Sequence, residues 1–568
     1  MVLPVMALAL ASAHCSSEEP APRQDDAVID NHPGDLVITS PKRAAFIEGD
    51  DGADVEIEGT GATSELTING QRADVSADGS FHAKVKATAG LNIVKAADGE
   101  SRLETPFLFG HFVSKDTPVA RAAAIQIGPE GMNGAAPLTS LSSITNQFLD
   151  GQDLMKAVKG KTFSGTIPGG SWSYKVTDAK YSDATAAFAP GQRGVDVDAA
   201  LKDVEVDGTL TMTVFSKKYT GPVKMTADRA TITGDVELSV DADEGKLSAK
   251  MPTAEANLEN FKFDSNNAGF PCCVDSIAKS FLEPKIEEAI RDQVKEIVPS
   301  SLALTLDGVG LPKELDLSAA GIARPIAVTA RLDDATFDQS GGNLSAAILF
   351  GDGSFGPTTP GFKAPGWLKL GGEAARARPV GLGVSFSLDA VNQLFFAAWG
   401  TGALTRSLPD APPVTGLKLD PALPPVLLAA DGGALRVALG EVVVNAAFGG
   451  GEPFTAAVSI TQDVVPGTEG QDLVLTPKGE PELSITWLDA ENVADGVRTI
   501  IAAAAKEQIQ KFLKPIKIPF PAIGLDKLGA SFAGKSLTLA EPTVAVDRAS
   551  ARVSVAGSIA LVTSAAKK

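Results

Sequence analysis

The sequence predicts an α+β protein in which long amphipathic helices lie against antiparallel sheets. Trains of short alternating strands recur along the chain, and twice such a train leads into a long helical segment that ends at a proline. These segments are expected at about 274–298 and 493–513. In the first of them, apolar residues recur at three- and four-residue steps, which is the period of one helical face. The repetition indicates two units of the same design.

Composition narrows the classes of function. A chain of 568 residues is expected to hold about three or four domains. Its net charge of −20 argues against nucleic acid, whose phosphates it would repel, and against strongly anionic lipid surfaces. All four histidines lie within the first 111 residues, so most of the chain lacks a histidine base or imidazole metal ligand. We therefore predict no catalytic residues, no metal and no cofactor.

One phosphate-binding motif is rejected because its flanking sequence does not fit. Residues 529–536 read GASFAGKS and fit a phosphate-binding loop letter for letter. That chemistry needs a strand before the loop and a helix after it, whereas the following residues alternate as a strand. His82 and His111 could ligate a metal, but isolated histidines are far more often ordinary surface or core residues. The chain is predicted not to be an enzyme.

The first residues indicate export. Residues 1–15 are predicted to be a signal peptide, because an apolar run too short to span a bilayer precedes small residues. Cleavage after an A-x-A site would leave a chain starting at His14. Alternatively, Cys15 is the lipid-modified anchor of a bacterial lipoprotein. Residues 16–35 are predicted to form a flexible acidic linker. The expected location is the outer membrane, the cell surface or the periplasm.

A small all-β module is predicted over 36–114. Short alternating stretches are separated there by the turn dipeptides Asn69-Gly70 and Asp78-Gly79. The run LTINGQRADVSADGSFHAKVKATAGLNIVKAADG resembles bacterial immunoglobulin-like modules, which implies a β-sandwich. Such modules are mostly spacers or adhesive units, so the fold alone implies no function.

The remaining chain alternates between strands and helices. Besides the two proline-ended helices, the pattern predicts helices over 138–158 and 388–408. Pro284 is expected to kink the helix at 274–298 or to open a second segment. The acidic stretch 241–245 is predicted to be a hairpin turn rather than a calcium loop, because it lacks the twelve-residue frame.

Three stretches resemble the family of bactericidal/permeability-increasing protein, lipopolysaccharide-binding protein and the plasma lipid transfer proteins. The first is TGPVKMTADRATITGDVELSVDADEGKL, followed by VDSIAKSFLEPKIEEAIRDQVKEIVPSSL; the others are GLGVSFSLDAVNQLFFAAWGTGAL and KPIKIPFPAIGLDKL. The resemblance implies two tandem tubular lipid-binding domains, over 118–318 and 319–568, with helices wrapped in a twisted sheet. It also implies apolar pockets for phospholipid acyl chains, lined by Leu141, Ile144, Phe148, Ile277, Phe281, Ile290, Leu388, Val391, Phe395, Val497, Ile501 and Phe512.

Two departures limit what the resemblance implies. The first domain of the family usually carries a disulfide, which the adjacent Cys272 and Cys273 cannot supply. The antibacterial members grip anionic endotoxin with a basic tip, whereas this chain is strongly acidic. Endotoxin binding and bactericidal activity are therefore not expected.

The sequence thus predicts an exported carrier or exchanger of phospholipid or another acyl lipid that meets a membrane surface. The sequence does not identify a protein partner. The alternative is an adhesive or structural surface protein whose tubular domains hold no ligand. A third possibility is a hydrolase that uses carboxylates alone, for which paired acidic residues buried in one cleft would be the sign.

Overall fold

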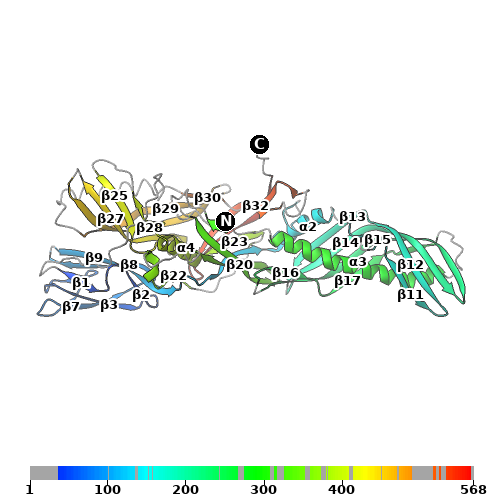
Figure 1. Cartoon of the computed structure of the whole chain (residues 1–568), viewed down its shortest axis with the longest axis horizontal. Coiled ribbons are helices and arrows are strands. Elements are labelled where there is room, and N and C mark those ends of the chain that lie inside the picture. Colours follow the sequence, from blue (N-terminus) through cyan, green and yellow to red (C-terminus); the bar gives the residue numbers. More distant parts are fainter. Residues whose placement is uncertain are drawn as a thin grey trace.

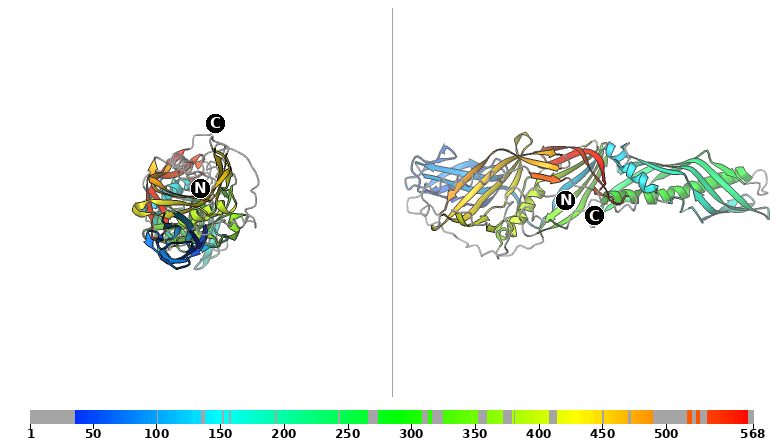
Figure 2. Two further views of the ribbon diagram at one scale, coloured as in Figure 1. Left: turned by 90° about the vertical axis from the view of Figure 1, so that its left-hand side faces the viewer. Right: turned by 90° about the horizontal axis from the view of Figure 1, so that it is seen from above.

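The computed structural model shows an elongated, mostly β molecule. It describes residues 36–563 except 100, 135–137, 151–152, 157, 193, 242–243, 266–273, 308–312, 316–324, 352–358, 372–378, 380, 408–413, 449–450, 470–471, 489–515, 520–522 and 526–531. A central sheet separates two curved sheets, and an N-terminal module lies beside the second of them (Figure 1). The view from above shows the first curved sheet extending away as an arm (Figure 2).

The N-terminal module consists of two sheets that face each other across one apolar core, which includes Ile57, Phe81, Phe107 and Phe109. One sheet has the order β1 (Val37–Ser40), β3 (Asp54–Thr60), β7 (Phe81–Lys86) and β6 (Asp74–Val75). The other has the order β2 (Ala45–Glu48), β9 (Ser101–Val113), β8 (Gly90–Asp98), β4 (Thr67–Ile68) and β5 (Gln71–Arg72). Both predicted turn dipeptides lie between strands, and Asn69, Gly70 and Gly79 have the positive φ angles that such turns require.

The central sheet joins the two units. Its order is β19 (Glu314–Leu315), β20 (Ile326–Asp338), β21 (Gly341–Phe350), β10 (Val119–Ile127), β23 (Leu382–Ser387), β33 (Arg552–Thr563), β32 (Lys535–Asp547) and β31 (Ile523–Gly524). Lys535 and Ser536, the last two residues of the rejected phosphate-loop motif, begin strand β32 rather than a helix. Residues of this sheet join the apolar cores of both units, for example Ile127 on one side and Val119 on the other.

The first unit is a sheet curved around one long helix. Its elements are α1 (Pro129–Asn133), α2 (Leu141–Leu149), β11 (Thr162–Ile167), β12 (Gly170–Lys180), β13 (Asp183–Pro190), β14 (Gly194–Val214), β15 (Lys217–Val240), β16 (Leu247–Lys250), β17 (Ala254–Glu259), β18 (Lys262–Asp264) and α3 (Val274–Asp307). The sheet order is β11-β12-β14-β15-β16, with β13 paired to β14 and with β17 and β18 paired to β15. Strands β15 and β16 pair around 241–245, so the predicted hairpin there is confirmed.

The second unit curves around helix α4. Its elements are η3 (Pro360–Lys363), β22 (Trp367–Lys369), α4 (Leu388–Gly400), β24 (Arg406–Ser407), β25 (Val414–Pro421), β26 (Val426–Ala429), η4 (Asp431–Gly433), β27 (Leu435–Phe448), β28 (Pro453–Glu469), β29 (Asp472–Trp487) and β30 (Ile516–Pro519). The sheet order is β24-β25-β27-β28-β29-β30, with β26 paired to β27. The helix predicted at 493–513 lies outside the described residues.

Three of the predicted helices have boundaries that differ from those expected. Helix α3 continues past Pro299 to Asp307, because Leu302 and Leu306 extend its buried face and that burial outweighs the hydrogen bond lost at proline. Helix α2 begins only at Leu141, after Ser140 caps it, and ends at Leu149. Helix α4 ends at Gly400, where Gly402 takes a positive φ and the two bonds of a Schellman motif close the last turn.

The N-terminal module is fixed to the second unit by a strand pairing, an ion pair and apolar packing. Strand β22 pairs with β9, so the second unit adds a strand to a module sheet. Arg43 donates from Nε and Nη2 to the carboxylate of Glu441, both at 2.8 Å, and this pair is largely buried. Leu91 and Leu428 join one apolar cluster between the two parts. The module therefore has its own core but is firmly packed against the second unit.

Candidate apolar binding site

The inner face of the first sheet is apolar along the whole of its two longest strands. Alternate residues of β14 and β15 are buried, as the period-two pattern predicts. The buried set on these strands and β12 includes Trp172, Tyr174, Val197, Val206, Leu210, Met212, Val223, Met225, Ile232 and Val236. The hydroxyl of Tyr174 donates a hydrogen bond to the carbonyl of Val206, and burial raises the pKa of that hydroxyl.

Helix α3 covers this face with one apolar stripe. Its buried aliphatic residues recur at every fourth position: Leu282, Ile286, Ile290, Val294, Val298, Leu302 and Leu306. The views in Figures 1 and 2 both show α3 running lengthwise along the sheet. A helix and a sheet share no backbone ladder, so side-chain packing carries most of the contact between them.

Polar bonds fasten α3 along one edge of the sheet. Glu287 accepts from the amide of Leu258 at 3.0 Å, Lys279 donates to the carbonyl of Phe261 at 3.1 Å, and Lys295 donates to the carbonyl of Pro252 at 3.0 Å. The three partners all lie within 252–261, the segment that contains β17. We call this side the fastened edge.

The opposite edge is closed by aromatic packing. Phe281 of α3 stacks on Trp172 of β12, with ring centroids 4.3 Å apart and planes 20° apart. Beyond Trp172 lies β11, whose inward residues Phe163, Gly165 and Ile167 are only half-buried. Gly165 makes room for the indole, because a Cβ there would lie 2.8 Å from Trp172 Nε1. We call Phe163, Ile167, Trp172 and Phe281 the β11 edge.

The far end of the first unit carries an exposed aromatic side chain. Phe215 lies in the turn between β14 and β15 and is 82% exposed. Its φ of 47° is in the left-handed region, which bulky residues rarely adopt. The Phe215 amide donates to the carbonyl of Gly169 at 3.0 Å, so the turns β14–β15 and β11–β12 lie together. We call these two turns the tip.

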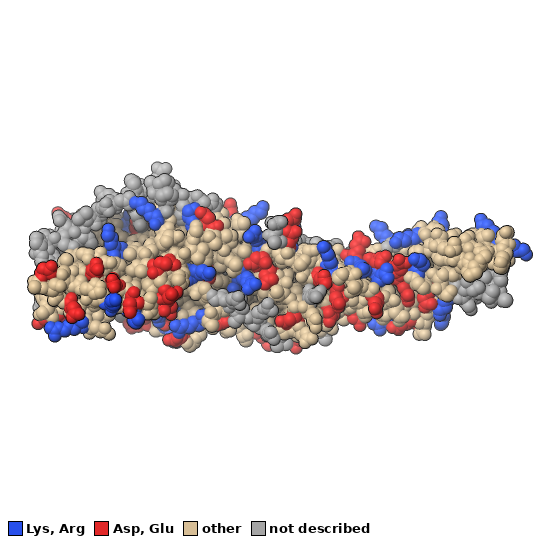
Figure 3. Space-filling model, turned by 90° about the horizontal axis from the view of Figure 1, so that it is seen from below, with Lys and Arg blue, Asp and Glu red and all other residues tan. Residues whose placement is uncertain are grey.

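The tip has a local charge opposite to that of the whole chain. Residues 161–175 and 208–224 contain five lysines and no aspartate or glutamate. The nearest acidic neighbours on paired strands are Asp207, which pairs with Lys224, and Asp264, both farther from the turn. Figure 3 shows this end of the molecule in tan with lysine blue, whereas acidic red concentrates along the rest of the arm. A net charge of −20 therefore does not describe this surface.

The predicted first-unit residues fall into two groups. Leu141, Phe281 and Ile290 belong to the core beneath α3, and Leu141 and Ile290 are 6% and 1% exposed. Ile144 and Phe148 instead pack on Leu525, Phe532 and Leu537 near the central sheet. The side chain of Ile277 lies outside the described residues.

In the second unit, Leu388, Val391 and Phe395 lie in one buried core. The predicted residues Val497, Ile501 and Phe512 lie outside the described residues, as do Cys15, Cys272 and Cys273.

Sequence reasoning missed the residues that distinguish the two edges and the tip. Trp172 could have been found as the one tryptophan on an alternating strand before the long helix. Phe215 follows five residues of β alternation and precedes two lysines, a pattern typical of a hairpin turn. Arg43 and Glu441 lie 398 residues apart, so no local pattern could pair them.

The structure also contains a hollow of about 600 Å³ lined by Gln192, Asp338, Gln339 and Ser340. It is open and polar, and it lies at the turns after β13 and β20 rather than among the apolar residues beneath α3. Asp196 and Asp235 face each other across β14 and β15, and burial followed by the Asp235 charge raises the pKa of Asp196. Both side chains are exposed, so this pair is not the buried acidic cleft that a carboxylate hydrolase needs.

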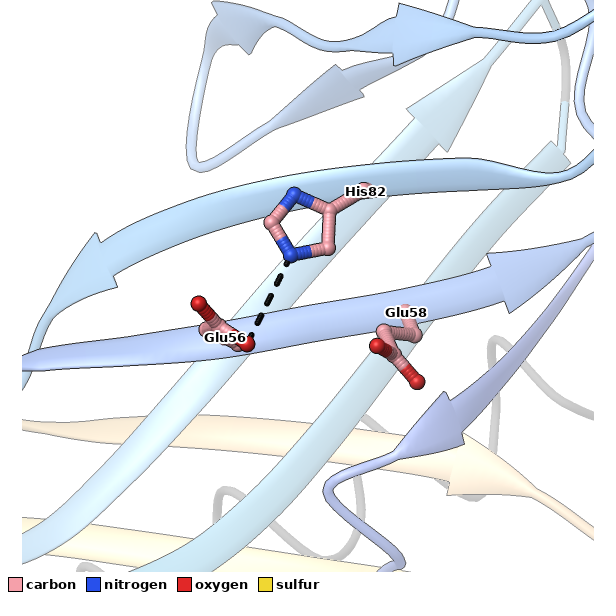
Figure 4. A group of neighbouring side chains, drawn as sticks. All are labelled: Glu56, Glu58 and His82. Carbon is pink, nitrogen blue, oxygen red and sulfur yellow. Dashed lines mark ion pairs between the residues drawn. The ribbon is translucent and has the colours of Figure 1, made fainter.

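Glu56, Glu58 and His82 bring their polar atoms within 4.8 Å of one another on the outer face of the module (Figure 4). His82 Nε2 lies 3.7 Å from Glu56, and Lys84 Nζ lies 3.3 Å from the same carboxylate. Because Lys84 already neutralises Glu56 and all three side chains are exposed, ion pairing between strands accounts for this group.

Among the residues that the structure describes, no helix combines the length and the apolar character needed to span a membrane.

No protein family and no curated protein matches the sequence. Among solved structures, lipopolysaccharide-binding protein is similar at 13% identity and a TM-score of 0.41, over 78% of this chain and 99% of its own. P47 of Clostridium botulinum E1 is similar at 8% identity and a TM-score of 0.30, over 78% and 100%. Takeout 1 of Epiphyas postvittana is similar at 14% identity and a TM-score of 0.21, over 29% and 90%. Because these identities and TM-scores are low, the similarities assign neither a ligand nor a role.

Proposed function

We propose that the chain binds acyl lipids, shields an acyl chain between α3 and the first curved sheet, and exchanges that lipid with a membrane that it touches with the tip. The observation that carries this proposal is a continuous apolar inner face covered mainly by one long helix, whose polar bonds to the sheet, among the described residues, lie along one edge. Parting such a helix from a sheet breaks no backbone ladder, and an acyl chain can replace the side-chain contacts that are lost.

Transfer energetics favour exchange over permanent storage. Each buried methylene contributes about 0.8 kcal/mol, so a long acyl chain gains on the order of 10 kcal/mol on leaving water. A bilayer offers nearly the same gain, so the lipid can return to it. In this proposal the chain is an exported bacterial protein with two tubular lipid-binding domains behind an immunoglobulin-like module.

A second candidate function is supported by the tight packing of the residues beneath α3. Leu282 and Leu302 are fully buried and Ile286 and Ile290 are 1% exposed, as in a packed interior without a ligand. An adhesive or structural surface protein would have such a core.

Lipid analysis separates the two candidates. The chain is purified without detergent, and its mass is measured under native conditions together with extracted lipid. The carrier predicts bound acyl lipid, or uptake of lipid after incubation with vesicles. A mass without lipid before and after incubation would reject the carrier and leave the adhesive protein.

Membrane contact is tested at Phe215. A phenylalanine that enters a bilayer contributes about 1.5–3 kcal/mol, so Phe215→Ser should weaken vesicle binding by roughly ten-fold or more. Binding is measured by flotation with vesicles of phosphatidylcholine containing some phosphatidylglycerol, because lysines flank the turn.

Phe215 lies outside the core, so thermal unfolding should be unchanged. Phe163→Ser is not a suitable control because Phe163 is half-buried against the core. Tyr219→Ser, farther along β15, is the matched variant. Equal binding by the parent chain and Phe215→Ser would show that the tip is not the contact.

A further inference from the structure

We propose that lipid enters and leaves the first unit sideways through the β11 edge, and that the stacked pair Trp172–Phe281 is the gate that the acyl chain displaces. This inference rests on the proposed function and names the place where the chain enters.

The two sides of α3 differ in what would have to break. On the fastened edge, three bonds to 252–261 involve charged side chains. The Lys295 bond is exposed and the other two are partly buried, so parting this edge requires water to replace each bond. At the β11 edge, the described contacts are apolar and include the stack of Phe281 on Trp172. An acyl chain can replace a ring contact, but it cannot replace a hydrogen bond. Opening therefore costs less at the β11 edge.

Strand β11 itself is suited to this entry. Among the residues that the structure describes, it pairs with β12 only and therefore forms an edge of the sheet. Its inward residues are half-buried, whereas those of β14 and β15 are buried, so the apolar face is least covered here. Gly165 adds no side chain, and the indole of Trp172 occupies the space above it. If that ring turns away, an apolar strip from Phe163 to Ile167 is exposed.

The β11 edge also adjoins the tip. Strand β11 ends at Ile167, and Gly169, two residues later, accepts the bond from Phe215. A lipid that leaves a bilayer beside Phe215 would meet the β11 edge first, while the fastened edge lies across the sheet. One end of the first unit thus combines a surface for membrane contact with the more easily opened side.

Fluorescence quenching tests this placement. The full chain is incubated with vesicles that contain phosphatidylcholine carrying a doxyl group on one acyl chain, and uptake is measured by native mass. Lipid in the β11 edge should quench Trp172, so Trp172→Phe should lose most of the quenching. Trp487→Phe in the second unit is the matched control and should retain it.

Exchange kinetics provide a second readout that does not depend on Trp172. Phe281→Ala should accelerate lipid release several-fold and leave the bound stoichiometry unchanged, and Phe281→Leu should restore a slow rate. Glu287→Ala loosens the fastened edge and should change release much less than Phe281→Ala does.

The outcomes separate the two proposals. Bound lipid, quenching that depends on Trp172 and faster release from Phe281→Ala would support the gate. Bound lipid with quenching unchanged in Trp172→Phe, or with Glu287→Ala releasing faster than Phe281→Ala, would overturn the gate and leave lipid binding standing. A parent chain that takes up no lipid would reject the proposed function and the gate with it.

Discussion

The two units bury their helices to different extents. Helix α3 of the first unit buries one stripe and leaves charged residues such as Lys285 and Glu288 in solvent. Helix α4 of the second unit is buried at every residue, including the polar ones. A helix that is surrounded on all sides can move only if several neighbours move with it. Helix α3 has fewer neighbours to displace, namely its sheet and the short helix α2.

Polar bonds strengthen this difference. Asn392 accepts from the amide of Leu427 at 2.7 Å, and Gln393 donates to the carbonyl of Thr117 at 2.7 Å. Asp389 accepts from the amide of Leu370 at 2.7 Å, although burial raises the pKa of its carboxyl. These bonds fix α4 to segments on several sides, whereas the bonds of α3 lie along one edge. In the proposed lipid exchange, this difference would let the first unit open while the second stays closed.

The largest expected effect comes from the core of the second unit. Phe395→Ala should lower the free energy of unfolding by about 4 kcal/mol, because a fully buried ring leaves a cavity that its neighbours cannot fill. Phe281→Ala, in the half-buried stack of the first unit, should cost about 1–2 kcal/mol. Urea unfolding measures both. Equal costs would contradict the difference between a closed unit and one that opens.

The next effect concerns the ion pair that joins the module to the second unit. Arg43→Ala should cost about 3 kcal/mol, because it leaves the Glu441 carboxylate buried without a partner. The double variant Arg43→Ala with Glu441→Gln should recover part of this loss. Denaturant unfolding combined with limited proteolysis near 114–118 follows the effect. A loss below that of an exposed pair such as Lys86–Asp54 would show that the module is only loosely attached.

Asparagines on α4 of the second unit and on α2 of the first unit provide a smaller, matched test. Asn392→Leu should cost about 2 kcal/mol, because the buried amide of Leu427 loses its acceptor. Asn146 on α2 accepts from the amide of Ala186 at 2.5 Å but is only half-buried, so water can replace it in Asn146→Leu. Thermal unfolding should therefore show a clearly smaller shift for Asn146→Leu. The reverse order would contradict the closed character of the second unit.

The smallest effect is a pH dependence in the module. His111 contacts Glu48 through Nδ1 and Asp50 through Nε2, each at 2.9 Å, and these bonds, Glu48 first, raise its pKa above 6.5. The stabilisation is complete below the pKa of the unfolded chain and is lost as the pH rises through the higher folded value.

Nuclear magnetic resonance of the imidazole should therefore give a His111 midpoint above 6.5 that falls in Glu48→Gln. The stability difference between the parent chain and His111→Gln should shrink between about pH 6 and pH 8. A difference that grows with pH would contradict this assignment.

The sequence pattern correctly predicted the elements that depend on interactions between residues close in the chain. The strands of the module, the hairpin at 241–245 and the existence of α3 and α4 follow from residue periodicity and turn chemistry, which act over a few residues. The helix ends were predicted less well. Tertiary burial carried α3 past Pro299, and a Schellman motif ended α4 earlier than its apolar residues suggested. The strand after the phosphate-loop motif was read correctly, because alternation is a local signal.

The sequence by itself determined that apolar helices would lie on apolar sheets, because a periodic face must be buried somewhere. Only the tertiary structure decided which residues share a core, since Leu141 packs under α3 while Ile144, three residues later, packs on the central sheet. It also decided that α3 is fastened along one edge, that Phe215 stands at a lysine-rich tip and that Arg43 meets Glu441. These features join residues far apart in the chain, and their energies depend on distance and burial in space.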